Sequence, residues 1–188
     1  NEKGNQCSAR FFLWPCIGLT MFGQKCIKKG WWHEIDDRVY VGGIPLVCLG
    51  HIRRLHGLGV TGVINLMAEY DGPVQSYAQF NIEQLHLPVI DHVAPSVEQT
   101  ITAIDFIQRH WDAGGAIFIH CKGGHGRSAA IGFAWLLKHC GMSLEEAQKH
   151  IRSRRKVRRK LYKQTELIQY YDEVVKGKPP ETKGPVTA

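Results

Sequence analysis

The stretch Ile117-Phe118-Ile119-His120-Cys121-Lys122-Gly123-Gly124-His125-Gly126-Arg127-Ser128-Ala129 joins an apolar strand to an apolar helix through a glycine-rich loop. Backbone N–H groups that turn inward in such a loop form a binding site for anions, and the positive N-terminal end of the following helix strengthens it. A free cysteine thiol has a pKa of about 8.5, which a helix N-terminus or a nearby cation lowers by several units. The sequence therefore predicts a phosphate-binding loop in which Cys121 is a thiolate nucleophile.

The residues that follow Cys121 suit the same chemistry. The planar guanidinium of Arg127 can bind two oxygens of a phosphoryl group, and the hydroxyl of Ser128 can donate a hydrogen bond to the sulfur when it leaves. Glycine lets the backbone approach those oxygens closely. The side chain of His125 either contacts substrate or faces water. We expect the phosphate to be bound by Lys122, Gly123, Gly124, His125, Gly126 and Arg127.

The alternative for Cys121 is a buried structural cysteine, because free cysteine behaves as a small hydrophobic residue. A structural cysteine needs neither a glycine-rich loop nor an arginine at a fixed offset, so we favour the nucleophile. The nucleotide-binding pattern Gly-x-x-x-x-Gly-Lys-Ser/Thr does not occur in the sequence.

The pattern His-Cys-x5-Arg-Ser after a strand resembles the signature of the cysteine-dependent protein tyrosine phosphatase superfamily, and the surrounding residues 31–175 are similar to its dual-specificity branch. Three passages resemble the mitochondrial phosphatidylglycerophosphate phosphatases, namely residues 31–45, 63–71 and 120–128. The family usually has alanine where Gly124 stands, and a proline-bearing loop where Arg158-Arg159-Lys160 stand. The resemblance implies hydrolysis of phosphomonoesters through a phosphocysteine. It favours phospholipid head groups as substrates over phosphoproteins, with a phosphate-binding pseudophosphatase as a remote alternative.

The resemblance also implies a general acid upstream of the nucleophile. Asp91 occupies that place at the end of an expected strand, and a carboxyl group can both protonate the leaving oxygen and later activate water. Asp91 could instead cap the next helix, but Ser96 is better placed for that role. His92 is a weaker candidate for the acid. His120 is expected to orient the loop through hydrogen bonds of its ring, rather than to bind a metal.

Basic residues gather between positions 152 and 163, where eight lysines and arginines occur without an acid. Because the whole chain has a net charge of +7, the remainder is close to neutral. The resemblance implies that this segment lies beside the active-site mouth, where Arg154, Arg155, Arg158 and Arg159 would form a basic collar. The collar would attract an anionic phosphomonoester substrate or an anionic membrane surface. Nucleic acid is disfavoured, because residues 152–160 hold no aromatic side chain for base stacking.

The pattern along the chain alternates strands with helices. Strands are expected over residues 38–44, 62–66, 84–90 and 116–120. Helices are expected over residues 49–58, 97–111, 128–139 and 163–175, and a further helix is expected to begin at a capping box formed by Ser143. This order predicts a single α/β domain over residues 31–176, with a mostly parallel twisted central sheet and helices on both faces. The resemblance adds that this fold is protein tyrosine phosphatase-like.

Cysteine usage bears on the cellular compartment and on metal binding. The six cysteines are irregularly spaced, which favours a reducing intracellular compartment, and zinc-site spacing is absent, so no metal or cofactor is expected.

Residues 1–30 hold an apolar run too short to span a bilayer, followed by lysines. They would contact a membrane, be the remnant of a targeting segment, or pack on the core, whereas residues 177–188 have the composition of a disordered tail. The resemblance suggests association with the mitochondrial inner membrane, with the cytoplasm as the alternative, and we expect a monomer.

Overall fold

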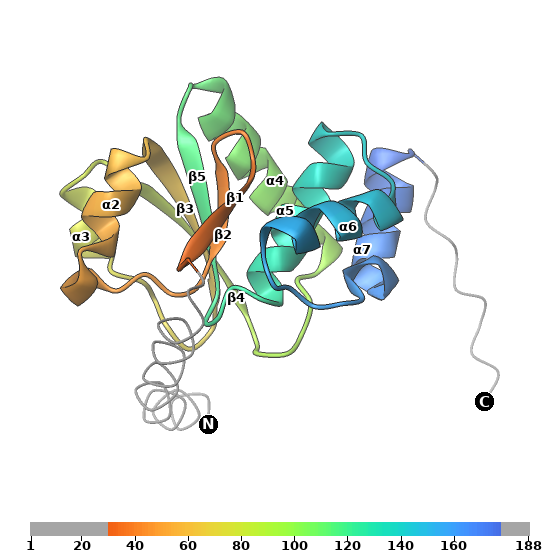
Figure 1. Ribbon diagram of the computed structural model, residues 1–188, viewed down its shortest axis with the longest axis horizontal. Coiled ribbons are helices and arrows are strands. Elements are labelled where there is room, and N and C mark those ends of the chain that lie inside the picture. Colours follow the sequence, from red (N-terminus) through yellow and green to blue (C-terminus); the bar gives the residue numbers. More distant parts are fainter. Residues whose placement is uncertain (1–29, 178–188) are drawn as a thin grey trace.

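A five-stranded sheet organises the chain (Figure 1). The order across the sheet is β1 (Trp32–Asp36), β2 (Val39–Gly42), β5 (Ala116–His120), β3 (Val60–Met67) and β4 (Glu83–Val89). β1 is antiparallel to β2, and every other neighbouring pair is parallel. The carboxyl ends of β2, β3, β4 and β5 therefore meet at one edge of the sheet, the lower edge in Figure 1.

This computed structural model describes residues 30–177. The expectations for residues 1–29, an apolar and basic segment, and for the tail from residue 178 concern parts of the chain outside the described residues. No helix within residues 30–177 is long and apolar enough to cross a membrane.

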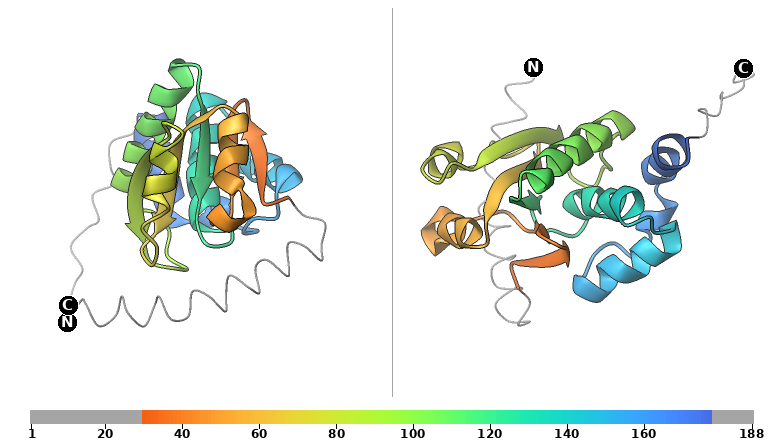
Figure 2. Two further views of the ribbon diagram at one scale, coloured as in Figure 1. Left: turned by 90° about the vertical axis from the view of Figure 1, so that its left-hand side faces the viewer. Right: turned by 90° about the horizontal axis from the view of Figure 1, so that it is seen from above.

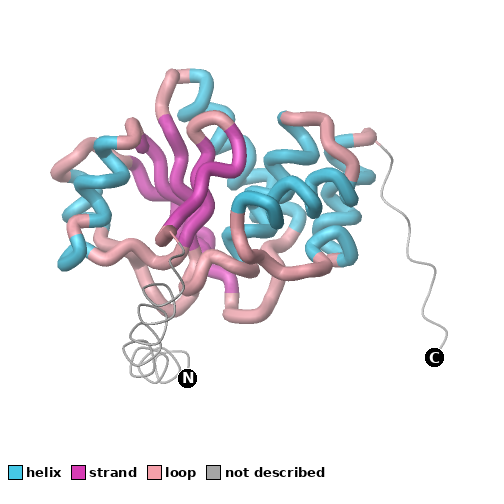
Figure 3. The backbone as a smooth tube through the Cα atoms, in the orientation of Figure 1, coloured by secondary structure: helices cyan, strands magenta, loops and turns pink. Residues whose placement is uncertain are grey.

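Helices cover both faces of the sheet, as the sequence predicts (Figure 2). On one face lie α4 (Val97–Asp112), α5 (Arg127–His139), α6 (Leu144–Arg154) and α7 (Thr165–Tyr170), which share the larger hydrophobic cluster with the sheet. On the other face, α2 (His51–Gly57) and α3 (Val74–Ala78) contribute to a smaller cluster around Phe118. Figure 3 shows the strands as a layer between these two groups of helices.

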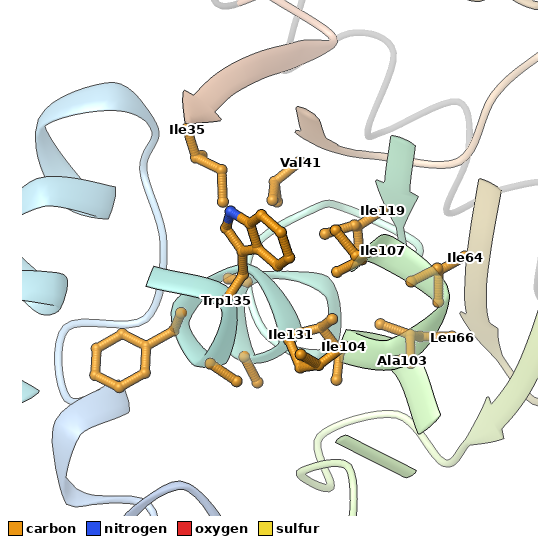
Figure 4. Close-up of a cluster of buried hydrophobic side chains, with 14 of the residues drawn as sticks. Ile35, Val41, Ile64, Leu66, Ala103, Ile104, Ile107, Ile119, Ile131 and Trp135 are labelled. Carbon is orange, nitrogen blue, oxygen red and sulfur yellow. The ribbon is translucent and has the colours of Figure 1, made fainter. Parts of the chain in front are cut away.

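The central helix α5 explains why its sequence is apolar all round. Every residue from Arg127 to Leu137 is buried, because the helix packs on the sheet and is itself covered by neighbouring helices. Gly132 allows this packing, since a Cβ there would come within 2.8 Å of the side chains of Ile35 and Val41. Trp135 fills the centre of the cluster (Figure 4), and its indole N–H donates to the Asp36 carboxylate at 2.8 Å. α5 thereby fixes the position of the loop that precedes it.

The predicted elements are found with small changes at their ends. Ser96 and Ser143 both form capping boxes, at the starts of α4 and α6. The helix expected over residues 49–58 divides into a 3-10 turn (Val47–Leu49) and α2, and the last helix ends in a π-helical turn (Tyr171–Val175). β1 and α3 were not predicted, because β1 is a half-polar edge strand and α3 has only five residues.

Candidate active site

The phosphate-binding loop lies at the carboxyl end of the central strand β5. Cys121 directly follows this strand, and α5 begins six residues later at Arg127. Gly126 stands at the N-cap of α5 and has no side chain to cap the helix, so the N–H groups of the first turn point toward the loop and can bind an anion. The loop therefore has the geometry that the sequence predicts for a phosphate site.

The surroundings of Cys121 favour its thiolate. Burial by itself raises the pKa of this thiol. Hydrogen bonds from the hydroxyl and backbone N–H of Ser128, the charge of Arg127 and the N–H of Gly124 together outweigh burial, so the pKa lies below its ordinary value. The Cys121 Sγ lies 3.3 Å from the Ser128 Oγ. The sulfur is thus held at the base of the loop in surroundings that stabilise its negative charge.

Arg155 differs from its expected place in an exposed collar. Its side chain is only 5% exposed, and its Nε and one terminal N–H group donate to the carbonyl oxygens of Gly124 (2.8 Å) and Gly123 (3.0 Å). Burial lowers its pKa to about 10, so it stays charged at neutral pH. By binding these carbonyl groups from behind, Arg155 orients the loop so that its N–H groups face the pocket.

Gly124 fits this arrangement because of its backbone. Its φ is +73°, and a Cβ at this position would come within 2.5 Å of the Gly42 carbonyl oxygen. An alanine at this position would be strained in this conformation.

Arg127 is held by an acidic residue that the sequence analysis did not select. Its side chain is 2% exposed and forms two hydrogen bonds of 3.0 Å with the two carboxylate oxygens of Glu69. It also donates to the carbonyl oxygen of Val89 at 2.8 Å. Glu69 lies just beyond the carboxyl end of β3, which is next to β5 in the sheet. Of this arrangement the sequence signals only that an acidic residue follows an expected strand.

Asp91 follows β4 and lies in the same pocket. Its Oδ1 forms an ion pair of 3.0 Å with Arg127, and the same oxygen accepts from the N–H of His92. His92 has a φ of +68° and an exposed side chain. Asp91 thus places a carboxyl group in the pocket wall beside the guanidinium of Arg127.

Arg158 connects the Asp91 loop to the phosphate-binding loop. Its guanidinium donates to the His92 carbonyl oxygen at 3.1 Å, and its backbone N–H donates to the His125 carbonyl oxygen at 2.9 Å. Arg158 therefore lies at the mouth, as expected, whereas Arg154 and Arg159 are exposed and are not among the residues that line the pocket.

The two histidines of the loop have different surroundings. His120 is fully buried, stacks on Phe118 and has its pKa lowered to about 3, mainly by burial, so its ring is neutral. Within residues 30–177 neither ring nitrogen has a hydrogen bond of good geometry, and the Cys121 backbone is the hydrogen-bonding group that acts on the ring, so His120 adjoins the start of the loop and is held mainly by packing. The Nδ1–H of His125 donates to the carbonyl oxygen of Lys156 at the pocket rim.

Together these side chains enclose a pocket of about 230 Å³. Its walls come from three loops, which follow β4, β5 and α6. They hold Asp91, His92, Cys121, Lys122, Gly123, His125, Gly126, Arg127 and Arg158. No group of three or more His, Cys, Asp or Glu side chains that could hold a metal occurs in the described part of the chain.

Comparison with known proteins agrees with this site. Residues 42–173 match the dual specificity phosphatase, catalytic domain, family. Phosphatidylglycerophosphate phosphatase PTPMT2 of Arabidopsis thaliana is 35% identical over 126 residues, which cover 65% of this chain and 54% of the plant protein. The chain thus spans about half the length of that relative. Phosphatidylglycerophosphatase and protein-tyrosine phosphatase 1 of Homo sapiens is 29% identical over 152 residues, which cover 76% of this chain and 75% of the human protein.

A solved structure gives the same result. The crystal structure of PTPMT1 in complex with PI(5)P has a TM-score of 0.67 and 27% identity, and the similarity covers 77% of this chain and 96% of that one. The sequence resemblance and the predicted fold are both confirmed. The chain belongs to the dual specificity phosphatase catalytic domain family.

Proposed function

We propose that the protein is a cysteine-dependent phosphatase that hydrolyses phosphomonoesters on phospholipid head groups. One observation carries the chemistry: the Cys121 thiol has a lowered pKa at the base of an anion-binding loop, beside an arginine held by Glu69. Such a thiolate can attack phosphorus, while the loop N–H groups and Arg127 bind the phosphoryl oxygens.

The proposed reaction has two steps. First, the Cys121 sulfur bonds to phosphorus as the phosphorus–oxygen ester bond breaks, and Asp91 gives its proton to the leaving oxygen. The resulting phosphocysteine is then attacked by water, whose proton passes to Asp91, and the sulfur leaves as a thiolate that the Ser128 hydroxyl stabilises at 3.3 Å.

Substrate binding would prepare the acid for this reaction. In the free enzyme Asp91 is paired with Arg127 at 3.0 Å. A phosphoryl dianion competes with the Asp91 carboxylate for the same guanidinium. When the dianion displaces it, the Asp91 carboxyl group is released from the guanidinium and can face the leaving oxygen.

The relatives support the lipid as substrate. Two of them are named for phosphatidylglycerophosphate hydrolysis, and the PTPMT1 structure contains the phosphoinositide PI(5)P. The human relative is also named a protein-tyrosine phosphatase, which keeps phosphotyrosine, phosphoserine and phosphothreonine proteins as the alternative. By analogy with these relatives we also propose association with the mitochondrial inner membrane.

The test compares turnover of short-chain phosphatidylglycerophosphate, short-chain phosphoinositides and phosphotyrosine peptides by one preparation, with Cys121→Ser as the blank. The proposal predicts that a phospholipid is hydrolysed with a kcat/KM at least about tenfold above that of the peptides, a difference of about 1.4 kcal/mol in transition-state binding. Faster hydrolysis of the peptides would refute the lipid assignment. Phosphate binding without hydrolysis of any ester would refute the enzyme assignment and favour a pseudophosphatase.

A further inference from the structure

Two loops at the active-site edge of the sheet expose apolar side chains. Ile90 and Val93 follow β4 and are 70% and 49% exposed, and Val47 and Leu49 follow β2 and are 52% and 44% exposed. Large hydrophobic side chains are exposed at seven positions within residues 30–177, and four of the seven lie on these two loops. We call Val47, Leu49, Ile90 and Val93 the docking edge.

Both loops are attached to the phosphate-binding loop. Because β2, β4 and β5 run parallel within the sheet, the segments that follow them leave the sheet at the same edge (Figure 1). The N–H of Ile44 donates to the carbonyl oxygen of Lys122 at 3.2 Å, and Arg158 donates to the carbonyl oxygen of His92. The docking edge therefore lies at the same edge of the sheet as the pocket, and Ile90 and Val93 flank Asp91 and His92 of the pocket wall.

Basic side chains lie at the same edge. Lys122 and Arg158 line the pocket, and Lys156, Arg159 and Lys160 are exposed beside Arg158. Apolar side chains that enter the interface, combined with cations that contact anionic head groups, are the two components by which proteins bind to the surface of a bilayer. This combination favours an anionic lipid surface over an uncharged protein surface.

The start of the described chain lies at this edge as well. Trp32, the first residue of β1, pairs with Gly42 at the carboxyl end of β2. Gly30, with which the described part of the chain begins, therefore lies at this edge of the sheet. In the sequence it is preceded by the apolar run Phe11-Phe12-Leu13-Trp14-Pro15-Cys16-Ile17-Gly18-Leu19-Thr20-Met21-Phe22 and then by Lys25, Lys28 and Lys29, a composition suited to the same interface.

We propose that the docking edge binds the surface of a bilayer that contains anionic phospholipids, so that the pocket opens onto the head groups. This inference rests on the proposed phospholipid substrate. Docking in this orientation brings a phosphomonoester to Cys121 without removal of the lipid from the membrane, and a pocket of about 230 Å³ needs to accept only the head group.

The binding test uses the full chain with Cys121→Ser, so that no substrate is consumed. Its partition onto vesicles of phosphatidylcholine, with and without phosphatidylglycerol, is measured by co-sedimentation. The variants are Val47→Ser with Leu49→Ser, and Ile90→Ser with Val93→Ser. The matched control replaces Leu58 and Ile168, two exposed apolar residues outside these loops, by serine. Circular dichroism and thermal unfolding verify that each variant is folded.

We expect the parent to bind the anionic vesicles more tightly, and each loop variant to lose about tenfold or more in partition, because interfacial binding scales with the apolar area that is buried. The control should bind like the parent. Partition of both loop variants equal to that of the parent would overturn the inference, and so would a parent that binds neither kind of vesicle.

A second readout separates this inference from the proposed function. Turnover of a short-chain phospholipid phosphomonoester dissolved in water depends on the pocket alone, so its absence in the unmodified enzyme would refute the function whatever the vesicle result. The ratio of turnover on vesicles to turnover on the short-chain lipid should fall about tenfold in Val47→Ser with Leu49→Ser. An unchanged ratio would contradict docking through this edge.

Discussion

Replacement of Glu69 by glutamine tests the mechanism by which Arg127 is oriented. Glu69 forms two hydrogen bonds of 3.0 Å with the guanidinium of Arg127, and both side chains are largely buried. Hydrogen bonds to charged groups contribute about 1.5–3 kcal/mol each. Glutamine keeps the shape and one acceptor but loses the charge, so we expect a loss of about 2–3 kcal/mol in stabilisation of the transition state. This loss corresponds to a fall in kcat/KM of roughly 30- to 160-fold.

The assay for Glu69→Gln is steady-state hydrolysis of a small aryl phosphate, with kcat and KM determined separately. Glu83→Gln is the matched control, since it removes an exposed carboxylate paired with Arg109 far from the pocket, a pair worth about 0–1 kcal/mol at most. We expect the loss mainly in kcat, because an arginine that is no longer held still binds anions but no longer fits the transition state. A kcat/KM within threefold of the control would refute a positioning role for Glu69.

Three further predictions concern the thiolate, the loop and the acid. Alkylation of Cys121 by iodoacetamide should reach its half-maximal rate at a pH below the ordinary cysteine pKa of about 8.5. Ser128→Ala should move that midpoint to higher pH. A midpoint at or above about 8.5 in the unmodified enzyme would contradict a stabilised thiolate. Arg155→Met should lower kcat/KM by at least about tenfold, because the Gly123 and Gly124 carbonyl groups lose their hydrogen-bond donors. Arg154→Met, at an exposed position, should change kcat/KM little. Equal effects of the two substitutions would refute the role of Arg155 in orienting the loop. Asp91→Asn should lower kcat by about 10²–10⁴-fold, and an unchanged kcat would assign the acid to another residue.

The sequence was most informative where local patterns determine structure. The capping boxes at Ser96 and Ser143 specify helix starts through their own side chains, and the buried strand before Cys121 is a continuous apolar run. The phosphate loop was predictable for the same reason, because its residues are adjacent in the chain.

Long-range contacts were harder to predict. Arg154 and Arg155 are neighbours in one basic run, yet only Arg155 is buried, because the chain leaves α6 there in an extended conformation and turns this side chain toward Gly123 and Gly124. Glu69 and Arg127 are far apart in sequence and meet only because β3 and β5 are neighbours in the sheet. Strand order, which the sequence does not reveal, decides such contacts.

In the proposed mechanism Cys121 carries the phosphoryl group during turnover. Its most direct test is rapid acid quenching of the enzyme during hydrolysis of a phosphomonoester, followed by mass spectrometry of the peptide that contains Cys121. Asp91→Asn should increase the trapped fraction if hydrolysis of the intermediate slows more than its formation does. We expect a phosphoryl group on Cys121 that is absent from Cys121→Ser. Turnover by the unmodified enzyme with no phosphoryl group on this cysteine at any quench time would contradict it.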